Sequence, residues 1–253
     1  MDVADNNDNY KKYKKHILIQ KIIKILRKLI APSSCILCSE KNIEYDGFCI
    51  DCYKKIQIIS EPQCVVCGIP FSIEGCNICG QCLREKPNFD WGRSLIKYNS
   101  DTKPLFMNIK HQERLDIIHN MVPLIKRIMD LLPVKIDYII PVPLHITRRI
   151  FRGYNQSSTI SYFVSKIINS PICYTQIKRI KITSPQGSNT DIGRVKNVRG
   201  AFKSTCNKRI KGKNILLIDD VWTSGSTINE ASKVLKKEGA KHVCVFTIGR
   251  AFK

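Results

Sequence analysis

Residues Ile215–Thr227 read ILLIDDVWTSGST and carry the strongest structural signal in the chain. The segment begins with four apolar residues, a run typical of a strand that is buried on both faces of a parallel sheet. Two acids, Asp219 and Asp220, follow directly, and a loop of hydroxyl-bearing residues and glycine comes next. Ligands of parallel sheets bind at the carboxyl ends of the strands, so these residues predict a binding site at that edge.

The two acids and the loop have the chemistry of a ribose 5-phosphate site. Adjacent carboxylates accept hydrogen bonds from vicinal hydroxyls or hold a divalent ion, and we assign Asp219 and Asp220 as the catalytic pair. The loop leads into a predicted helix, whose N-terminus favours a phosphate. Thr227 and Glu230 have the spacing of a capping box, which supports the start of that helix. The predicted substrate-binding residues of the loop are Val221, Thr223, Ser224, Gly225, Ser226 and Thr227.

Strands and helices alternate on both sides of this segment. Apolar or alternating patterns predict strands at residues 91–98, 136–142, 214–218 and 242–248. Helical spacing of apolar residues predicts helices at 103–111, 114–132, 154–169 and 227–239. This alternation predicts an α/β fold, a parallel sheet flanked by helices, over residues 89–253.

Nine of the twelve cysteines lie between Cys35 and Cys82, mostly as Cys-x-x-Cys pairs. In a cytosolic chain such pairs indicate metal sites rather than disulfides, because two thiolates on a tight turn can bind one ion. Two pairs complete a tetrahedral set of four sulfur ligands, which is typical of structural zinc. The first predicted site consists of Cys35, Cys38, Cys49 and Cys52.

The second site includes Cys64 and Cys67, but two later cysteine pairs could supply its other two ligands. They are Cys76 with Cys79, or Cys79 with Cys82. We favour Cys64, Cys67, Cys79 and Cys82, because the glycine after Cys79 resembles the glycine after Cys67, and small residues free backbone N–H groups for ligated thiolates. The sequence therefore predicts a double zinc ribbon over residues 32–88, with two structural zinc ions.

The charge of the chain is strongly positive and unevenly distributed. The formal net charge is +21, and residues 141–213 hold fifteen Lys and Arg but a single acid. A general bias toward lysine raises net charge without a binding role, but such a bias does not exclude acids from one segment. The concentration predicts a partner that carries phosphates, such as a nucleotide or a nucleic acid.

Residues 1–31 form an acidic tail followed by a basic segment. The first nine residues lack the positive start and apolar core of a secretory signal, so a cytoplasmic location is expected. Residues 16–30 have helical apolar spacing, but four basic residues interrupt them, so we expect an amphipathic helix and no transmembrane segment. Docking of this helix on the protein itself is the favoured interpretation, and a peripheral position at the inner membrane face is the alternative.

The segment 215–227 resembles the phosphoribosyl pyrophosphate (PRPP) signature of type I phosphoribosyltransferases. Other segments resemble the competence-related ComF family, which combines that fold with an N-terminal double zinc ribbon. The matching residues are KHQERLD at 110–116, PVPLH at 141–145, RGYNQ at 152–156 and NVRGAF at 197–202. The resemblance covers residues 32–253, and Cys76 is an additional thiol in the second ribbon.

The resemblance implies the transfer of ribose 5-phosphate from PRPP, with Mg²⁺, to an acceptor that the sequence does not identify. On this basis Arg148, Arg149 and Arg152 are assigned to the pyrophosphate, and Arg199 to a loop that closes over it. Preorganised cations at the leaving group stabilise the negative charge that develops there. His145 and Trp222 have no assigned role in catalysis, and for Trp222 we favour packing behind the loop.

Three functions remain open. The first is a phosphoribosyltransferase whose ribbon replaces the usual acceptor-binding hood. The second, suggested by the family's link with natural competence, is an accessory protein that handles single-stranded DNA in uptake or recombination, together with competence proteins. The third is a ribbon adaptor with an inactive site, although both acids and the whole loop are present.

Overall fold

The computed structural model describes residues 35, 37–38, 40, 48–72, 75–111, 115–145, 154–181, 198–205 and 208–252. Contacts divide the chain into two compact units, residues 1–53 and residues 54–253. The second predicted ribbon lies in the larger unit. The domain boundary that the sequence suggests near Pro87 stays a prediction.

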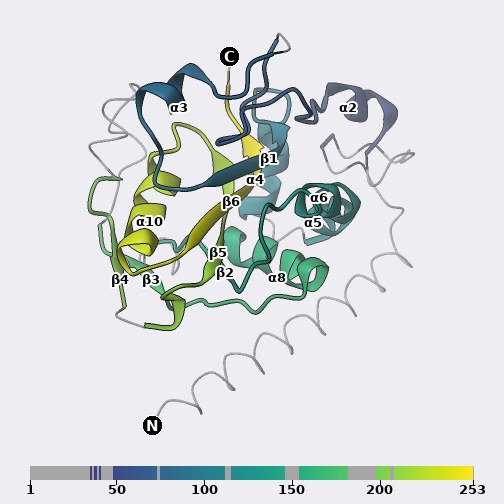
Figure 1. The fold of residues 1–253 in the computed structure, drawn as a ribbon. Coiled ribbons are helices and arrows are strands. Elements are labelled where there is room, and N and C mark those ends of the chain that lie inside the picture. The colour runs from purple at the N-terminus through teal and green to yellow at the C-terminus, as the bar shows by residue number, and fades with distance from the viewer. Residues whose placement is uncertain are drawn as a thin grey trace. The chain divides into compact units, whose positions relative to one another are not determined.

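The larger unit is built on a parallel four-stranded sheet (Figure 1). Its strands are β1 (Trp91–Lys97), β6 (His242–Arg250), β5 (Asn214–Trp222) and β2 (Tyr138–Pro141), in that spatial order. Eight of the nine residues of β6 are buried, as the apolar run in the sequence indicates. The predicted parallel sheet flanked by helices is confirmed.

Helices cover both faces of the sheet (Figure 1). On one face, α10 (Ser226–Lys237) packs against β5 and β6. On the other, α8 (Gln156–Ile168) packs against β2 and β5, and α6 (Val122–Met129) packs against α8 and β1. The remaining helices are α2 (Ile50–Lys55), α3 (Gly80–Arg84), α4 (Lys103–His111) and α5 (Leu115–Asn120). The helices of the described part of the chain are all too short or too polar to span a bilayer.

Two features differ from the predictions. The single helix expected at 114–132 is divided into α5 and α6, because Pro123 in the first turn of α6 has no N–H to continue a helix. The sequence also gave no indication of an antiparallel hairpin, formed by β3 (Ile177–Arg179) and β4 (Phe202–Ser204). This hairpin packs against α10, so it extends the layer on that face of the sheet.

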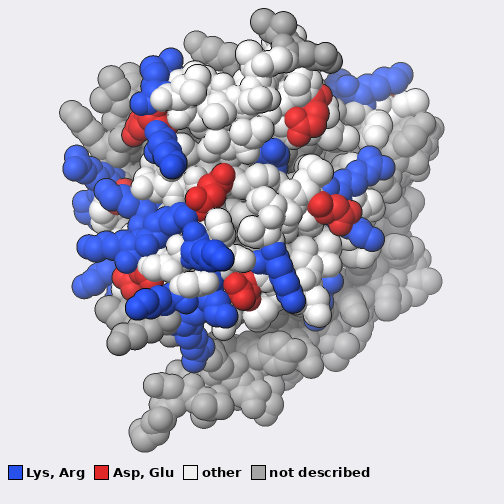
Figure 2. All heavy atoms as spheres, in the orientation of Figure 1, with Lys and Arg blue, Asp and Glu red and all other residues white. Residues whose placement is uncertain are grey.

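Basic side chains gather on the face that includes α10 (Figure 2). Backbone hydrogen bonds join Gly212 to Gly239 and Lys241 to Lys213, which brings the start of β5 next to the end of α10. These segments lie at the amino-terminal edge of the strands. We call the following exposed or half-exposed residues the basic surface: Arg209, Lys211, Lys213, Lys233, Lys236, Lys237 and Lys241.

The closest packing between sheet and helix predicts a sensitive position at Gly249. A Cβ atom there would lie 2.4 Å from Cζ of Phe106, whose side chain is 1% exposed. Gly249→Ala should therefore lower the free energy of unfolding by about 1–3 kcal/mol, the range for overpacking. Urea denaturation of the wild type and the variant measures this difference.

A matched control is Gly80→Ala. A Cβ atom at Gly80 would meet only the flexible end of Arg84, at 3.4 Å. Because Gly80 lies in α3, where alanine is favoured over glycine, this control should leave the free energy of unfolding unchanged or raise it by about 0.5–1 kcal/mol. Equal unfolding curves for Gly249→Ala and the wild type would contradict the described contact with Phe106.

Candidate functional site

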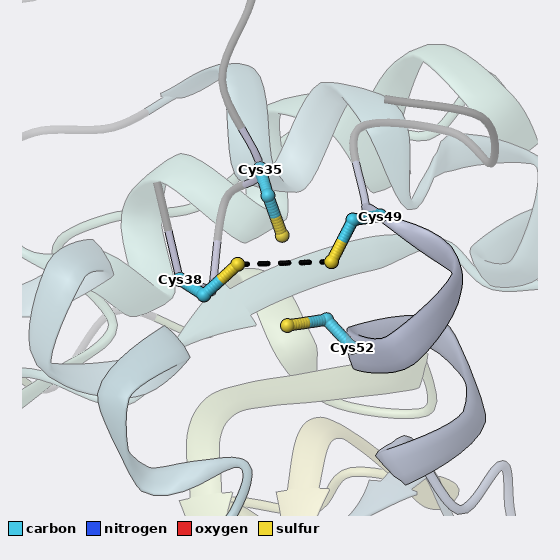
Figure 3. Close-up of side chains that lie close together, drawn as sticks. All are labelled: Cys35, Cys38, Cys49 and Cys52. Atoms are coloured by element: carbon cyan, nitrogen blue, oxygen red, sulfur yellow. Dashed lines mark hydrogen bonds between the residues drawn. The ribbon is translucent and has the colours of Figure 1, made fainter. Parts of the chain in front are cut away.

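The first cysteine cluster belongs to the smaller unit. The Sγ atoms of Cys35, Cys38, Cys49 and Cys52 lie within 4.8 Å of one another and point toward a common centre (Figure 3). The Sγ atoms of Cys38 and Cys49 are 3.6 Å apart. Sulfurs at the corners of a tetrahedron around zinc are about 3.8 Å apart for Zn–S bonds of about 2.3 Å. The donor set therefore fits zinc.

The second cluster lies in the larger unit and brings together Cys64, Cys67, Cys79 and Cys82, all within the same 4.8 Å limit. The Sγ atoms of Cys67 and Cys79 are 3.7 Å apart, and the backbone N–H of Cys79 donates to Sγ of Cys64 over 3.3 Å. Cys76 is exposed and is not part of the cluster. These are the four ligands that the sequence favours.

Backbone hydrogen bonds stabilise the first thiolate of each cluster. Burial acts to raise the pKa of Cys35, but backbone groups of its own cluster outweigh this and lower the pKa to about 6. The same balance lowers the pKa of Cys64 to about 7. Burial, followed by the charge of Cys67, raises the pKa of Cys82. Four adjacent thiolates need a cation, and the four sulfur ligands of each cluster fit zinc.

The two acids lie inside β5, which continues to Trp222 and is longer than the predicted strand at 214–218. They follow the last residue of β5 that pairs with β2, and so lie toward the carboxyl edge of the sheet. The carboxylate of Asp219 accepts a hydrogen bond from the hydroxyl of Ser157 over 2.9 Å and one from the backbone N–H of Asp220 over 3.0 Å. The carboxylate of Asp220 accepts one from the backbone N–H of Val221 over 2.8 Å. These bonds orient both carboxylates, which are partly exposed.

The loop after the acids lines an open pocket at the N-terminus of α10. Gly225 is the N-cap of the helix and has a positive φ of 77°, a conformation that favours glycine. The hydroxyls of Ser224 and Ser226 are 2.9 Å apart. An anion in this pocket would face the first-turn N–H groups of a helix, which have no helical partner. The lining residues are Val221, Trp222, Thr223, Ser224, Gly225, Ser226, Thr227 and Ile228.

The predicted capping box is wrong. The N-cap is Gly225, without a side-chain cap, and Thr227 lies inside the helix. Glu230 instead accepts a hydrogen bond from the backbone N–H of Gly200 over 2.7 Å. This bond ties the segment that contains Arg199 to the second turn of α10. The neighbouring Lys181 donates to the carbonyl of Arg199 over 2.8 Å.

The other predicted arginines, Arg148, Arg149 and Arg152, lie outside the described residues. The residues that follow them are described. Asn155 caps α8 by accepting from the N–H of Ser157, and its side-chain amide donates to the carbonyl of Val142. This contact fixes the start of α8 at the carboxyl end of β2, and so places Ser157 next to Asp219.

Sequence reasoning missed Ser157 and two buried arginines, Arg93 and Arg250. Ser157 gives no signal of its own, because its partner is 62 residues away along the chain. Arg93 and Arg250 do give a sequence signal, because each places a positive charge in or at the end of an apolar strand. Trp222 is buried and packs edge-to-face against Phe89 with ring centroids 5.2 Å apart, in keeping with the expected packing role.

Two zinc ions should be present per chain. Cys82→Ser should lower the zinc content by one ion, since Cys82 belongs to the second cluster. Cys76→Ser is the matched control and should keep both ions. Metal analysis of protein purified without chelator measures the content, and loss of zinc from Cys76→Ser but not from Cys82→Ser would contradict the described ligand set.

Family models match both parts of the chain. The double zinc ribbon domain matches residues 26–83, and the phosphoribosyl transferase domain matches residues 122–250. The second match contains the acids and the loop of the candidate site. The first contains both cysteine clusters.

Relatives align over most of the chain. Competence protein F of Haemophilus influenzae is 33% identical over 227 residues, which cover 86% of this chain and 96% of the relative. DNA utilization protein YhgH of Escherichia coli (strain K12) is 27% identical over 231 residues, which cover 88% of this chain and 99% of the relative. Competence protein ComFC of Bacillus subtilis is 25% identical and covers 80% and 84%.

Among solved structures, adenine phosphoribosyltransferase from Saccharomyces cerevisiae aligns with a TM-score of 0.37 and 16% identity, covering 65% of this chain and 80% of that chain. The family models and the relatives agree with the geometry of the sheet, the loop and the two cysteine clusters. The chain therefore belongs to the ComF family, with a double zinc ribbon ahead of a phosphoribosyltransferase domain.

Proposed function

We propose that the chain binds PRPP together with Mg²⁺ and transfers its ribose 5-phosphate to an acceptor nucleophile. One observation carries the proposal. Two carboxylates lie near the carboxyl end of β5, which leads into a pocket formed at the N-terminus of α10. A ribose 5-phosphate has vicinal hydroxyls at one end and a phosphate at the other, and this arrangement offers acceptors for the first and N–H donors for the second.

Each carboxylate has a distinct supporting contact in this proposal. The hydroxyl of Ser157 and the N–H of Asp220 hold the carboxylate of Asp219, and the N–H of Val221 holds that of Asp220. A carboxylate with a fixed orientation loses little freedom when it binds a sugar hydroxyl. The pair therefore holds the ribose ring while the bond at the anomeric carbon breaks.

Departure of pyrophosphate leaves positive charge on the ribose and negative charge on the leaving group. Mg²⁺ held by the pyrophosphate would neutralise part of that negative charge. Arg148, Arg149 and Arg152 are proposed to bind the same group, and Arg199 to approach it from the segment that Glu230 tethers to α10. A loop that closes over the site, as the family resemblance implies, would exclude water, which competes with the acceptor.

Calorimetric titration with PRPP and Mg²⁺ tests the site. Asp219→Asn and Asp220→Asn should each weaken binding by about 1–3 kcal/mol, because each removes a charged acceptor for a hydroxyl. Ser157→Ala should weaken it by about 1 kcal/mol, since the carboxylate of Asp219 loses one orienting bond. Circular dichroism should show an intact fold in all three.

Asp137→Asn is the matched control for these variants. The carboxylate of Asp137 accepts from the N–H of Asn214 at the opposite edge of the sheet. The control should bind PRPP like the wild type. Unchanged affinity in both Asp219→Asn and Asp220→Asn would refute the assigned site, and absence of binding by the wild type would refute the proposed function.

The second candidate function is the handling of single-stranded DNA. The names of the relatives support this candidate, because they contain the terms competence and DNA utilization. The basic surface supports it, because seven Lys and Arg gather where β5 begins and α10 ends. Two of these lysines form ion pairs. Nζ of Lys236 lies 2.6 Å from Oδ2 of Asp90, and Nζ of Lys213 lies 3.6 Å from Oδ1 of Asp137.

The salt dependence of DNA binding tests this candidate. Affinity for single-stranded DNA should fall steeply with salt, and replacing Lys211, Lys237 and Lys241 together by Ala should reduce the log–log slope by about 2, at about 0.7 per phosphate contact. Asp220→Asn should leave DNA binding unchanged. PRPP with Mg²⁺ should not compete, because the basic surface and the loop lie at opposite edges of the strands.

Competition by PRPP would instead assign DNA to the carboxyl edge, where Arg148, Arg149 and Arg152 were predicted to act. No DNA binding at low salt would refute the second candidate. Tight binding that the triple variant leaves unchanged would exclude the basic surface as the binding site.

A further inference from the structure

Two arginines are buried at the junction between the second ribbon and the sheet. Arg93 on β1 and Arg250 at the end of β6 are 7% and 4% exposed. Arginine is seldom fully buried unless its charge is balanced and its N–H groups find acceptors. The partners of these two side chains therefore indicate what the junction is built to hold.

Both guanidinium groups donate to backbone carbonyls of the turn that holds Cys64 and Cys67. Nη1 of Arg93 donates to the carbonyls of Cys64 and Val65 over 3.2 and 3.3 Å, and to that of Gly92 on its own strand over 2.9 Å. Nη1 of Arg250 donates to the carbonyl of Cys67, and its Nη2 lies 3.4 Å from Sγ of the same residue. Four thiolates around one zinc ion carry a formal charge of −2, which two guanidinium groups balance.

Arg250 also contacts Trp222, its partner on the neighbouring strand β5. The guanidinium carbon lies 4.0 Å from the centroid of the tryptophan ring, within the distance of a cation–π contact. The same guanidinium thus contacts a zinc ligand and the indole. No other described cation lies over this ring.

Trp222 in turn lies directly against residues 223–227, which we call the phosphate loop after the ligand group proposed for it. A Cβ atom at Gly225 would be only 2.6 Å from Nε1 of Trp222, and one at Gly92 on β1 would be 2.8 Å from its Cζ3. The ribbon is equally close to β1, because a Cβ atom at Gly68 would lie 2.5 Å from the carbonyl oxygen of Gly92. The indole has no room to shift without moving Gly225, the N-cap of α10.

We propose that Arg250 is a positioning residue that couples zinc in the second cluster to the phosphate loop through Trp222. Zinc fixes Cys67, Cys67 and the ring hold Arg250, and the ring holds Gly225 in its left-handed conformation. The effect on PRPP rests on the proposed function, whereas the effect on the loop does not. Coupling is reciprocal, so a ligand bound to the loop must also raise the affinity of this cluster for zinc.

Hydrogen exchange of the ligand-free protein tests the coupling at the loop. Cys82→Ser and Cys52→Ser each disrupt one cluster, and metal analysis verifies that each protein has lost one zinc ion. In Cys82→Ser the peptide that covers residues 219–228 should exchange about fivefold faster or more, the lower range for coupled sites. In Cys52→Ser it should exchange as in the wild type. Equal exchange in both variants would overturn the proposal.

Arg250→Lys provides a second variant that keeps the positive charge and all eight zinc ligands, and metal analysis verifies its zinc content. Lysine lacks the planar group that contacts Cys67 and the ring together, so exchange of the same peptide should increase. Arg179→Lys is the matched control, because Arg179 lies 5.5 Å from the ring centroid of Phe202 in the hairpin. Wild-type exchange in Arg250→Lys would overturn the role of Arg250.

Zinc transfer to a chromophoric chelator tests the reciprocal effect. PRPP with Mg²⁺ should slow the release of one of the two zinc ions from the wild type, and should not slow release from Arg250→Lys. Unchanged release from a wild type that binds PRPP would contradict the coupling. If the wild type does not bind PRPP, the proposed function fails and the exchange experiment alone decides the coupling.

Discussion

The parallel pairing of β5 with β6 determines where the acids, the loop after them and the contact with the second ribbon lie. Both strands have buried apolar centres, and their register sets Asp219 beside Thr247 and Trp222 beside Arg250. Shifting a strand by one residue would turn its side chains to the opposite face, so burial fixes this register strongly. The acids, the phosphate loop and the arginine that contacts the ribbon all take their positions from it.

The second ribbon is part of the same compact unit as the sheet. Backbone carbonyls, a glycine turn and two buried guanidinium groups make polar and close contacts between the ribbon and β1 and β6. Val66, Ile69 and Phe71 of the ribbon also pack against the apolar core of the sheet. Small zinc modules have little core of their own and depend on the metal for stability. A ribbon attached through its metal ligands makes the metal part of the junction, and the phosphoribosyltransferase domain gains a contact that depends on zinc.

The sequence predicted those parts of the molecule that depend on local patterns. The apolar run of β5, the acids after it and the eight clustered cysteines are visible without a structure, because burial and metal binding select residue types at fixed spacing. Contacts between distant segments were not predictable. Arg250 and Cys67 are separated by 183 residues, and Glu230 joins Gly200 rather than its own helix start. The choice of Cys82 over Cys76 agrees with the structure, although the glycine that suggested it, Gly80, begins α3 instead of a tight turn.

The central claim is that the loop at the start of α10 binds the phosphate end of PRPP and that the acids of β5 bind its ribose. A crystal structure of the zinc-loaded protein grown with saturating PRPP and Mg²⁺ tests this most directly. We expect the 5-phosphate against the backbone of Thr223–Thr227 and the ribose hydroxyls on Asp219 and Asp220. An ordered loop without ligand, or PRPP bound at another edge of the sheet, would contradict it.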